Sequence, residues 1–169
     1  MNIRESIYKR RSVRSFLEKE VEDTIIKSLL EDAMAAPTAC NKQPWEFYVI
    51  KNKEKQNTIK SKIMYSNFNS PIMIVVAGNT DLSLTKDNND FWIQDCSAAI
   101  ENILLSAVSF GLGTCWCGLY PIEKRCERVK NILELPDNII PLGIIHIGYP
   151  DKEVIGRTQY KEDKVHYID

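Results

Sequence analysis

Apolar residues recur with helical spacing in five segments of the chain. In residues 25–34 they form one continuous stripe, which is typical of a helix packed on a core. Asn2 precedes the first segment and suits a helix cap, because its side chain can accept a backbone N–H. Pro37 ends the second helix, since the residue before a proline avoids helical backbone angles. The pattern predicts helices over about residues 2–9, 22–36, 52–64, 91–110 and 121–133.

Three other segments have the length and the β-branched and aromatic content of strands. Two of them are residues 45–50 and residues 139–149, and the second is interrupted by Pro141 and Gly143. Residues 71–77 are apolar without a break, which predicts a central strand buried on both faces.

The remaining segments show neither the helical nor the strand pattern. Residues 80–90 are polar and predict a loop. Gly111 is placed to end the helix over residues 91–110, and the three glycines of residues 111–118 predict a Gly-rich turn. From Asp151 onward the chain is polar, which predicts a tail that runs over a surface, either its own or a partner's.

The helix over residues 91–110 is apolar on nearly every side. Such a helix must be covered all round. At about 30 Å long, it is more than one subunit of 169 residues can cover alone. The sequence therefore predicts a dimer independently of any family.

Size and charge narrow the range of functions. A chain of 169 residues, 44% of them hydrophobic, predicts a single domain over residues 1–169. A net charge of −1 makes nucleic acid or an anionic membrane a poor partner. The polar start shows no signal peptide, and polar residues within 91–110 argue against a membrane span. Five cysteines, an odd count, indicate reduced thiols and a cytoplasmic protein.

Residues 10–14 read RRSVR and place three guanidinium groups and a hydroxyl directly after the first helix. The simplest interpretation is a solvated basic cluster that interacts with the helix dipole. The alternative is an anion site, because arginine pairs with phosphate oxygens through two parallel hydrogen bonds.

Residues 37–45 read PTACNKQPW and lie between a predicted helix and a predicted strand. As an ordinary connection, the segment would use Asn41 as a turn residue. That interpretation leaves Gln43 and Trp45 unexplained. A loop of small polar groups can also aim amides and hydroxyls at a heteroaromatic ring.

Residues 111–118 read GLGTCWCG and would be a plain helix ending followed by a loop, or a place where glycines let a ligand approach the backbone. Cys115 and Cys117 are poor metal ligands by spacing, since structural zinc sites use longer separations and further ligands. His146 lies in an apolar segment and reads as a core residue, so a catalytic triad is not indicated.

Together these segments resemble the signatures of the nitroreductase family of FMN-dependent oxidoreductases. The resemblance implies an α+β fold with a mostly antiparallel central sheet flanked by helices. It also implies an intertwined homodimer with FMN at the subunit interface and no metal. In the family two basic residues near the end of the chain return to the FMN phosphate; Arg157 matches the first, whereas Gln159 departs from the second.

The resemblance also assigns roles. Arg10 and Ser12 would grip the phosphate, and Arg14 would lie towards the pyrimidine end of the flavin. The loop at Asn41 would reach the flavin held mainly by the other subunit, and the main chain near Cys117 and Gly118 would approach flavin N5 and O4. The cofactor-binding residues predicted in this way are Arg10, Arg11, Ser12, Arg14, Pro37, Thr38, Ala39, Asn41, Gln43, Trp116, Cys117, Gly118 and Arg157.

The activity implied is ping-pong transfer of hydride from NADH or NADPH, through flavin N5, to a small acceptor such as a nitroaromatic or a quinone. No catalytic acid or base is assigned, because protons can come from water. Within the family the alternatives are reductive dehalogenation, flavin fragmentation and dehydrogenation of a peptide heterocycle. Outside it they are an FMN carrier or sensor without turnover, and a thiol-redox protein that uses Cys115 and Cys117.

Overall fold

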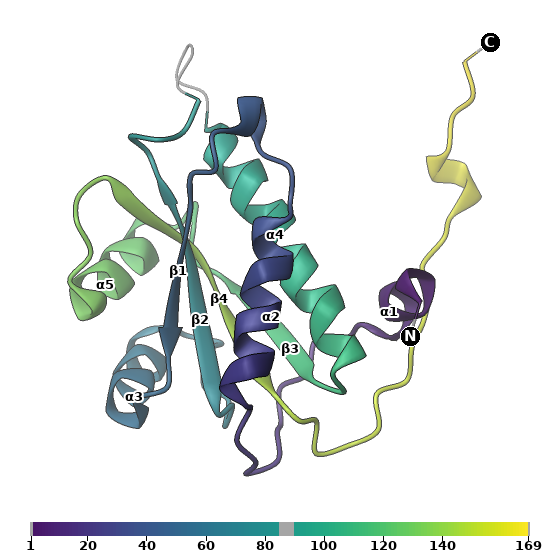
Figure 1. Cartoon of the computed structure of the whole chain (residues 1–169), viewed down its shortest axis with the longest axis horizontal. Coiled ribbons are helices and arrows are strands. Elements are labelled where there is room, and N and C mark those ends of the chain that lie inside the picture. Colours follow the sequence, from purple (N-terminus) through teal and green to yellow (C-terminus); the bar gives the residue numbers. More distant parts are fainter. Residues whose placement is uncertain (1, 85–89, 169) are drawn as a thin grey trace.

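A four-stranded antiparallel sheet lies between helices in the computed structural model, which describes residues 2–84 and 90–168 (Figure 1). The strands stand in the order β1-β2-β4-β3, and every neighbouring pair is antiparallel. The α+β fold with an antiparallel sheet is thereby confirmed. The strands are β1 (Trp45–Ile50), β2 (Ile72–Asn79), β3 (Gly113–Gly118) and β4 (Ile139–Gly148).

Helices cover both faces of this sheet (Figure 1). One apolar cluster joins α2 and α4 to one face, and a second joins α3 and α5 to the other. The predicted helices are all present, with ends that differ from the expected ones by a few residues at most. Their bounds are α1 (Ile3–Lys9), α2 (Asp23–Met34), α3 (Lys53–Lys62), α4 (Phe91–Ser109) and α5 (Glu123–Leu133), with short 3-10 helices η1 (Ala39–Asn41) and η2 (Glu162–Lys164).

β2 is the central strand that its unbroken apolar run predicts, since every residue from 72 to 78 is buried. Its neighbour β4 is continuous through Pro141 and Gly143 rather than interrupted. The register with β2 shifts between Val76 and Ala77, so that Leu142 has no partner opposite it. Proline and glycine are tolerated at this point because a bulge relaxes the demands of the ladder.

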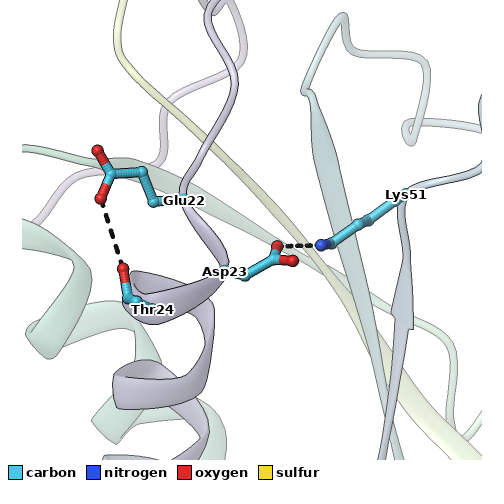
Figure 2. A network of polar contacts seen from close by, with 4 residues as sticks. All are labelled: Glu22, Asp23, Thr24 and Lys51. Atoms are coloured by element: carbon cyan, nitrogen blue, oxygen red, sulfur yellow. Dashed lines mark hydrogen bonds and ion pairs between the residues drawn. The ribbon is translucent and has the colours of Figure 1, made fainter.

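The start of α2 is tied to the end of β1 by side chains (Figure 2). Lys51 pairs with Asp23, and the hydroxyl of Thr24 donates to a carboxylate oxygen of Glu22 at 3.4 Å. Glu22 itself makes no side-chain cap to the helix backbone. Glu22 and Asp23, which were expected to open this helix, therefore bond to the side chains of Thr24 and Lys51 rather than to the helix backbone. Their negative charge is also favourable at a helix N-terminus.

A single subunit buries eight of the 19 residues of α4. Ala99 and Ile103 are 0% exposed within a single subunit, where they belong to the main apolar cluster. The expectation that one subunit cannot cover this helix is therefore wrong for the side that carries these residues. Leu105, in contrast, is only half-buried. The surface available for a dimer is therefore the side of α4 that carries Leu105, together with other exposed apolar residues.

Residues 113–118 form the edge strand β3, so the prediction of a Gly-rich turn is wrong from Gly113 onward. Gly111, with a φ of 71°, does end α4 as expected. The error has a tertiary cause, because β3 pairs along its whole length with β4, which is distant in sequence. Gly113 is also needed for a close approach: a Cβ there would lie 2.6 Å from the side chain of Val13.

The chain beyond β4 leaves the body of the subunit (Figure 1). It touches α1 where the N–H of Arg157 donates to the carbonyl of Tyr8 at 3.0 Å. Residues 155–168 are all exposed, including apolar Ile155 and Val165. Of the loop expected over residues 80–90, residues 85–89 lie outside the described part of the chain. No helix within residues 2–84 and 90–168 is long and apolar enough to cross a membrane.

Candidate functional site

The arginine cluster begins where α1 ends. Asn2 caps the helix by accepting the N–H of Glu5 at 3.0 Å, and the Glu5 carboxylate accepts the N–H of Asn2 in return. At the other end the N–H of Arg10 donates to the carbonyl of Ser6 at 2.9 Å. Because the backbone groups at both ends of this short helix are hydrogen-bonded, the position at which the chain leaves the helix at Arg10 is fixed.

After the helix, the chain runs beside the outer edge of β3. The N–H of Val13 donates to the carbonyl of Thr114 at 2.8 Å, and Ser12 and Thr114 form a parallel bridge. Asn69 then holds both backbone groups of Phe16: its Oδ1 accepts the N–H at 2.9 Å and its Nδ2 donates to the carbonyl at 2.7 Å. Sequence reasoning missed Asn69, because an asparagine in a polar loop carries no pattern of its own.

A pocket of about 230 Å³ opens between this segment and the chain after β4. Four guanidinium groups reach it from two parts of the sequence almost 150 residues apart. Such a pocket fits a phosphate dianion, because several arginines can share its oxygens. Gln159 adds a neutral donor where the family pattern expects a cation. The residues that line the pocket are Ile7, Arg10, Arg11, Ser12, Arg14, Arg157 and Gln159.

One of these guanidinium groups already has an acidic neighbour. Nε of Arg10 lies 3.5 Å from Oε1 of Glu101, which projects from α4. Burial raises the pKa of Glu101, and the charge of Arg10 acts in the opposite direction. A carboxylate beside a phosphate site competes with the ligand for the cation.

The edge of β3 offers backbone amides next to this pocket. The carbonyl of Thr114 points away from β4, since it accepts the N–H of Val13. Backbone groups alternate direction along a strand. Trp116 and Gly118 therefore also direct their N–H groups away from β4, whereas the N–H of Cys117 faces it. The N-terminal segment pairs with this edge at Thr114, through Ser12 and Val13, so both amides lie beyond the pairing.

The loop of residues 37–43 lies elsewhere, beside the N-terminal part of α4. There the N–H of Ala39 donates to Asp95 at 2.8 Å. The residues that line the arginine pocket include none from this loop, and the pocket meets α4 at Glu101, the partner of Arg10. Glu101 lies six residues beyond Asp95 on α4, which is about 9 Å along the helix. One subunit therefore gathers Arg10, Arg11, Ser12, Arg14 and Arg157 in the pocket and places Arg14 near β3. Pro37, Thr38, Ala39, Asn41 and Gln43 lie outside that pocket.

The two cysteines of β3 share one face of the sheet. Cys115 is opposite His146 and Cys117 is opposite Ile144. A hydrogen bond from Cys117 lowers the pKa of Cys115 to about 7, helped by the charge of Arg14 and opposed by burial. The same bond raises the pKa of Cys117. In the described part of the chain no three His, Cys, Asp or Glu side chains gather in a way that could hold a metal ion.

His146 is the core residue that its apolar strand predicts. It is 0% exposed, and its two ring nitrogens each lie 2.7 Å from a hydroxyl oxygen, of Ser66 and of Ser70. Burial, and then the charge of Lys60, lower its pKa to about 3. The ring is therefore neutral near pH 7 and fixes the loop that leads into β2.

Comparison with known proteins agrees with this architecture. A sequence model described as the Nitroreductase family matches residues 7–71 and 60–149. The chain is 38% identical over 168 residues to a Methanothermobacter thermautotrophicus protein provisionally named NADH dehydrogenase/NAD(P)H nitroreductase. That alignment covers 98% of this chain and 86% of the relative.

Solved structures agree as well. A Parabacteroides distasonis protein with the same provisional name is 35% identical and superposes with a TM-score of 0.92, over 98% of this chain and 96% of the other. An FMN-dependent nitroreductase from Clostridium difficile is 28% identical, with a TM-score of 0.87 over 97% and 98% of the two chains.

Proposed function

The chain belongs to the nitroreductase family, and from that premise we propose that it is a homodimeric FMN enzyme that passes hydride from NADH or NADPH to a small acceptor. The family and the names of the relatives make it an NAD(P)H-dependent oxidoreductase. We treat residues 1–169 as one FMN-binding domain. The acceptor class that this proposal favours is nitroaromatic compounds and quinones.

The observation that carries the proposal is the arginine pocket. It unites residues 10–14 with Arg157, which are the segments that the family resemblance assigns to the FMN phosphate. In this proposal Arg10, Ser12 and Arg157 bind the phosphate, with Arg11 lining the same pocket. Arg14 lies close enough to the thiols of β3 for its charge to lower the pKa of Cys115. That position next to β3 suits a cation near the ring system of the cofactor.

Bound FMN would supply the centre that accepts and donates hydride. The chain would orient that centre with the outward amides of Trp116 and Gly118, because a backbone N–H can hydrogen-bond a ring nitrogen or carbonyl oxygen. Of the two positions that the resemblance implies, Gly118 keeps this role, and Trp116 takes the place of Cys117, whose N–H faces β4. A positive charge at Arg14 would stabilise negative charge that develops on the ring.

A second copy of the chain completes the site in this proposal. The loop of residues 37–43 does not line the arginine pocket of its own subunit, so it would serve the partner's. The exposed apolar residues of the tail, and Ile3 and Ile7 on α1, supply surface for such a partner to cover. The dimer would therefore be intertwined, as the resemblance implies.

The alternatives are separated by turnover. An FMN carrier or sensor would bind flavin but would not oxidise NADH or NADPH steadily when a quinone or nitroaromatic compound is added. A thiol-redox protein would lose its activity in a Cys115→Ser/Cys117→Ser variant, whereas a flavin enzyme would keep it. Dehalogenation, flavin fragmentation or heterocycle chemistry would show as turnover of those substrates in preference to quinones.

The proposal is tested by anaerobic titration of the FMN-loaded protein with NADH and with NADPH. We expect the visible flavin band to bleach, and to return when a quinone is added. Binding of FMN without bleaching by either nucleotide would favour the carrier or sensor.

A further inference from the structure

The loop of residues 37–43 has a strained backbone. Cys40, Asn41 and Gln43 have φ angles of 49°, 55° and 51°, in the left-handed region. Asparagine tolerates this region, whereas cysteine and glutamine seldom adopt it. A conformation of this kind persists only when the surrounding structure enforces it, and such strain collects at functional sites.

Most of the hydrogen bonds that shape the loop stay within it. The N–H of Gln43 donates to the hydroxyl of Thr38 at 3.0 Å, and the Gln43 amide donates to Oδ1 of Asn41 at 2.8 Å. Two backbone bonds from Asn41 and Lys42 also close on Thr38 and Ala39. Among the described residues, the hydrogen bonds of residues 38–43 leave the loop at one point, where the N–H of Ala39 donates to Asp95.

Asp95 is unusual for a residue of this apolar helix. It is 4% exposed, and its Oδ1 accepts the N–H of Ala39 at 2.8 Å. Its Oδ2 is buried with no hydrogen-bond partner in the described part of the chain. A buried carboxylate oxygen without a partner opposes folding. Asp95 is thus a poor choice for the core and a strong acceptor for the loop, since bonds to a charged group exceed neutral ones.

We propose that Asp95 is a positioning residue that holds the loop of residues 37–43 in its strained form for contact with the flavin. The inference rests on the proposed function, because that function gives the loop its ligand. Asp95 acts through the amide of Ala39 and does not touch the cofactor. The rigid helix α4 supplies the fixed point, and the exposed side chains of Asn41 and Gln43 are the groups that the loop presents.

The test is hydrogen exchange by mass spectrometry on wild type, Asp95→Ala and Asp95→Asn, paired with titration by FMN. A hydrogen bond to a charged group is worth a factor of about 10 to 150 in an equilibrium. We expect Asp95→Ala to speed exchange in residues 38–43, and to raise the Kd for FMN, by about this factor. Asp95→Asn keeps a carbonyl oxygen as acceptor and should restore most of both effects.

Gln56→Ala is the matched control. Gln56 is also buried, and its amide donates to the carbonyls of Ile50 and Pro71, away from the loop. It should lower stability and leave exchange at residues 38–43 and FMN affinity unchanged. An equal loss of FMN in Gln56→Ala would reduce the Asp95 effect to general destabilisation and overturn the inference.

Two further results would also overturn it: unchanged exchange at residues 38–43 in Asp95→Ala, or an Asp95→Asn protein as impaired as Asp95→Ala. Failure of the proposed function looks different. A wild type that binds no FMN would remove the ligand, while the exchange data would still decide whether Asp95 anchors the loop.

Discussion

Nε of Arg10 lies 3.5 Å from Oε1 of Glu101, so the first residue of the arginine pocket is already paired with a carboxylate of α4. Both side chains are partly exposed, at 33% and 46%. A pair with this exposure contributes at most about 1 kcal/mol. It is weak enough for a phosphate dianion to displace Glu101 as the partner of Arg10.

Arg10→Ala should weaken FMN binding by a factor of about 10 to 150, corresponding to a charge-assisted contact of about 1.5–3 kcal/mol. Arg4→Ala is the matched control, because Arg4 is exposed and donates to the hydroxyl of Tyr8 on the same helix. Quenching of flavin fluorescence measures both affinities. Riboflavin, which lacks the phosphate, should bind both variants alike. Equal FMN affinities for the two variants would mean that the phosphate lies elsewhere.

Glu101→Gln should strengthen FMN binding by about 2- to 5-fold, because the phosphate no longer competes with a carboxylate for Arg10. The affinity for riboflavin should not change, which separates this effect from a change in the ring site. The same fluorescence titration measures both ligands. Weaker FMN binding in Glu101→Gln would show instead that Glu101 orients Arg10 for the phosphate.

Removal of residues 160–169 should shift the protein towards monomers and release FMN with them. The described tail carries Tyr160, Val165 and Tyr167, which are exposed in one subunit. In the proposed dimer these side chains pack on the partner, so the truncation removes that contact. Light scattering with simultaneous flavin absorbance follows both changes. A Glu162→Ala/Lys164→Ala protein, which keeps the apolar residues, should remain a dimer. A truncated protein that stays dimeric and yellow would remove the tail from the interface.

Stability should fall in mild acid because of His146. Its pKa is about 3 in the folded chain, against about 6.5 when unfolded. Between these values the unfolded state binds a proton that the folded state does not, so the free energy of unfolding decreases as pH falls from about 6.5 towards 3. The loss at pH 5 should be about 2 kcal/mol.

Urea denaturation at pH 7 and pH 5, at fixed protein and FMN concentrations, measures this loss. His146→Gln should flatten the dependence on pH. His166→Gln, which changes the exposed histidine of the tail, is the matched control and should leave the dependence as in wild type. A slope that persists in His146→Gln would assign the acid sensitivity to other groups.

Local patterns predicted most of the fold. The apolar run of β2 and the stripe of α2 each need only their own residues to be interpreted. β3 was mistaken for a turn because its strand character depends on β4. The helix over residues 91–110 was expected to need a second subunit because periodicity shows that a helix face is apolar, but not what covers it.

The site divides in the same way. Arg10, Arg11, Ser12, Arg14 and Arg157 line the arginine pocket and belong to the set that the family resemblance implied, whereas Ile7 was not expected there. Asn69 and Asp95 were missed, because each acts through backbone contacts that form only in the folded chain. Gln159 lines the pocket in spite of its departure from the family pattern, since its place depends on the backbone and not on its charge.

The central claim is that this chain holds FMN in the pocket of Arg10, Ser12 and Arg157. The most direct test is visible absorption of the purified protein, followed by mass analysis of the cofactor released on denaturation. We predict a yellow protein that releases FMN, with one molecule for each subunit after reconstitution. Release of FAD, or the absence of bound flavin even after reconstitution with FMN, would contradict the account.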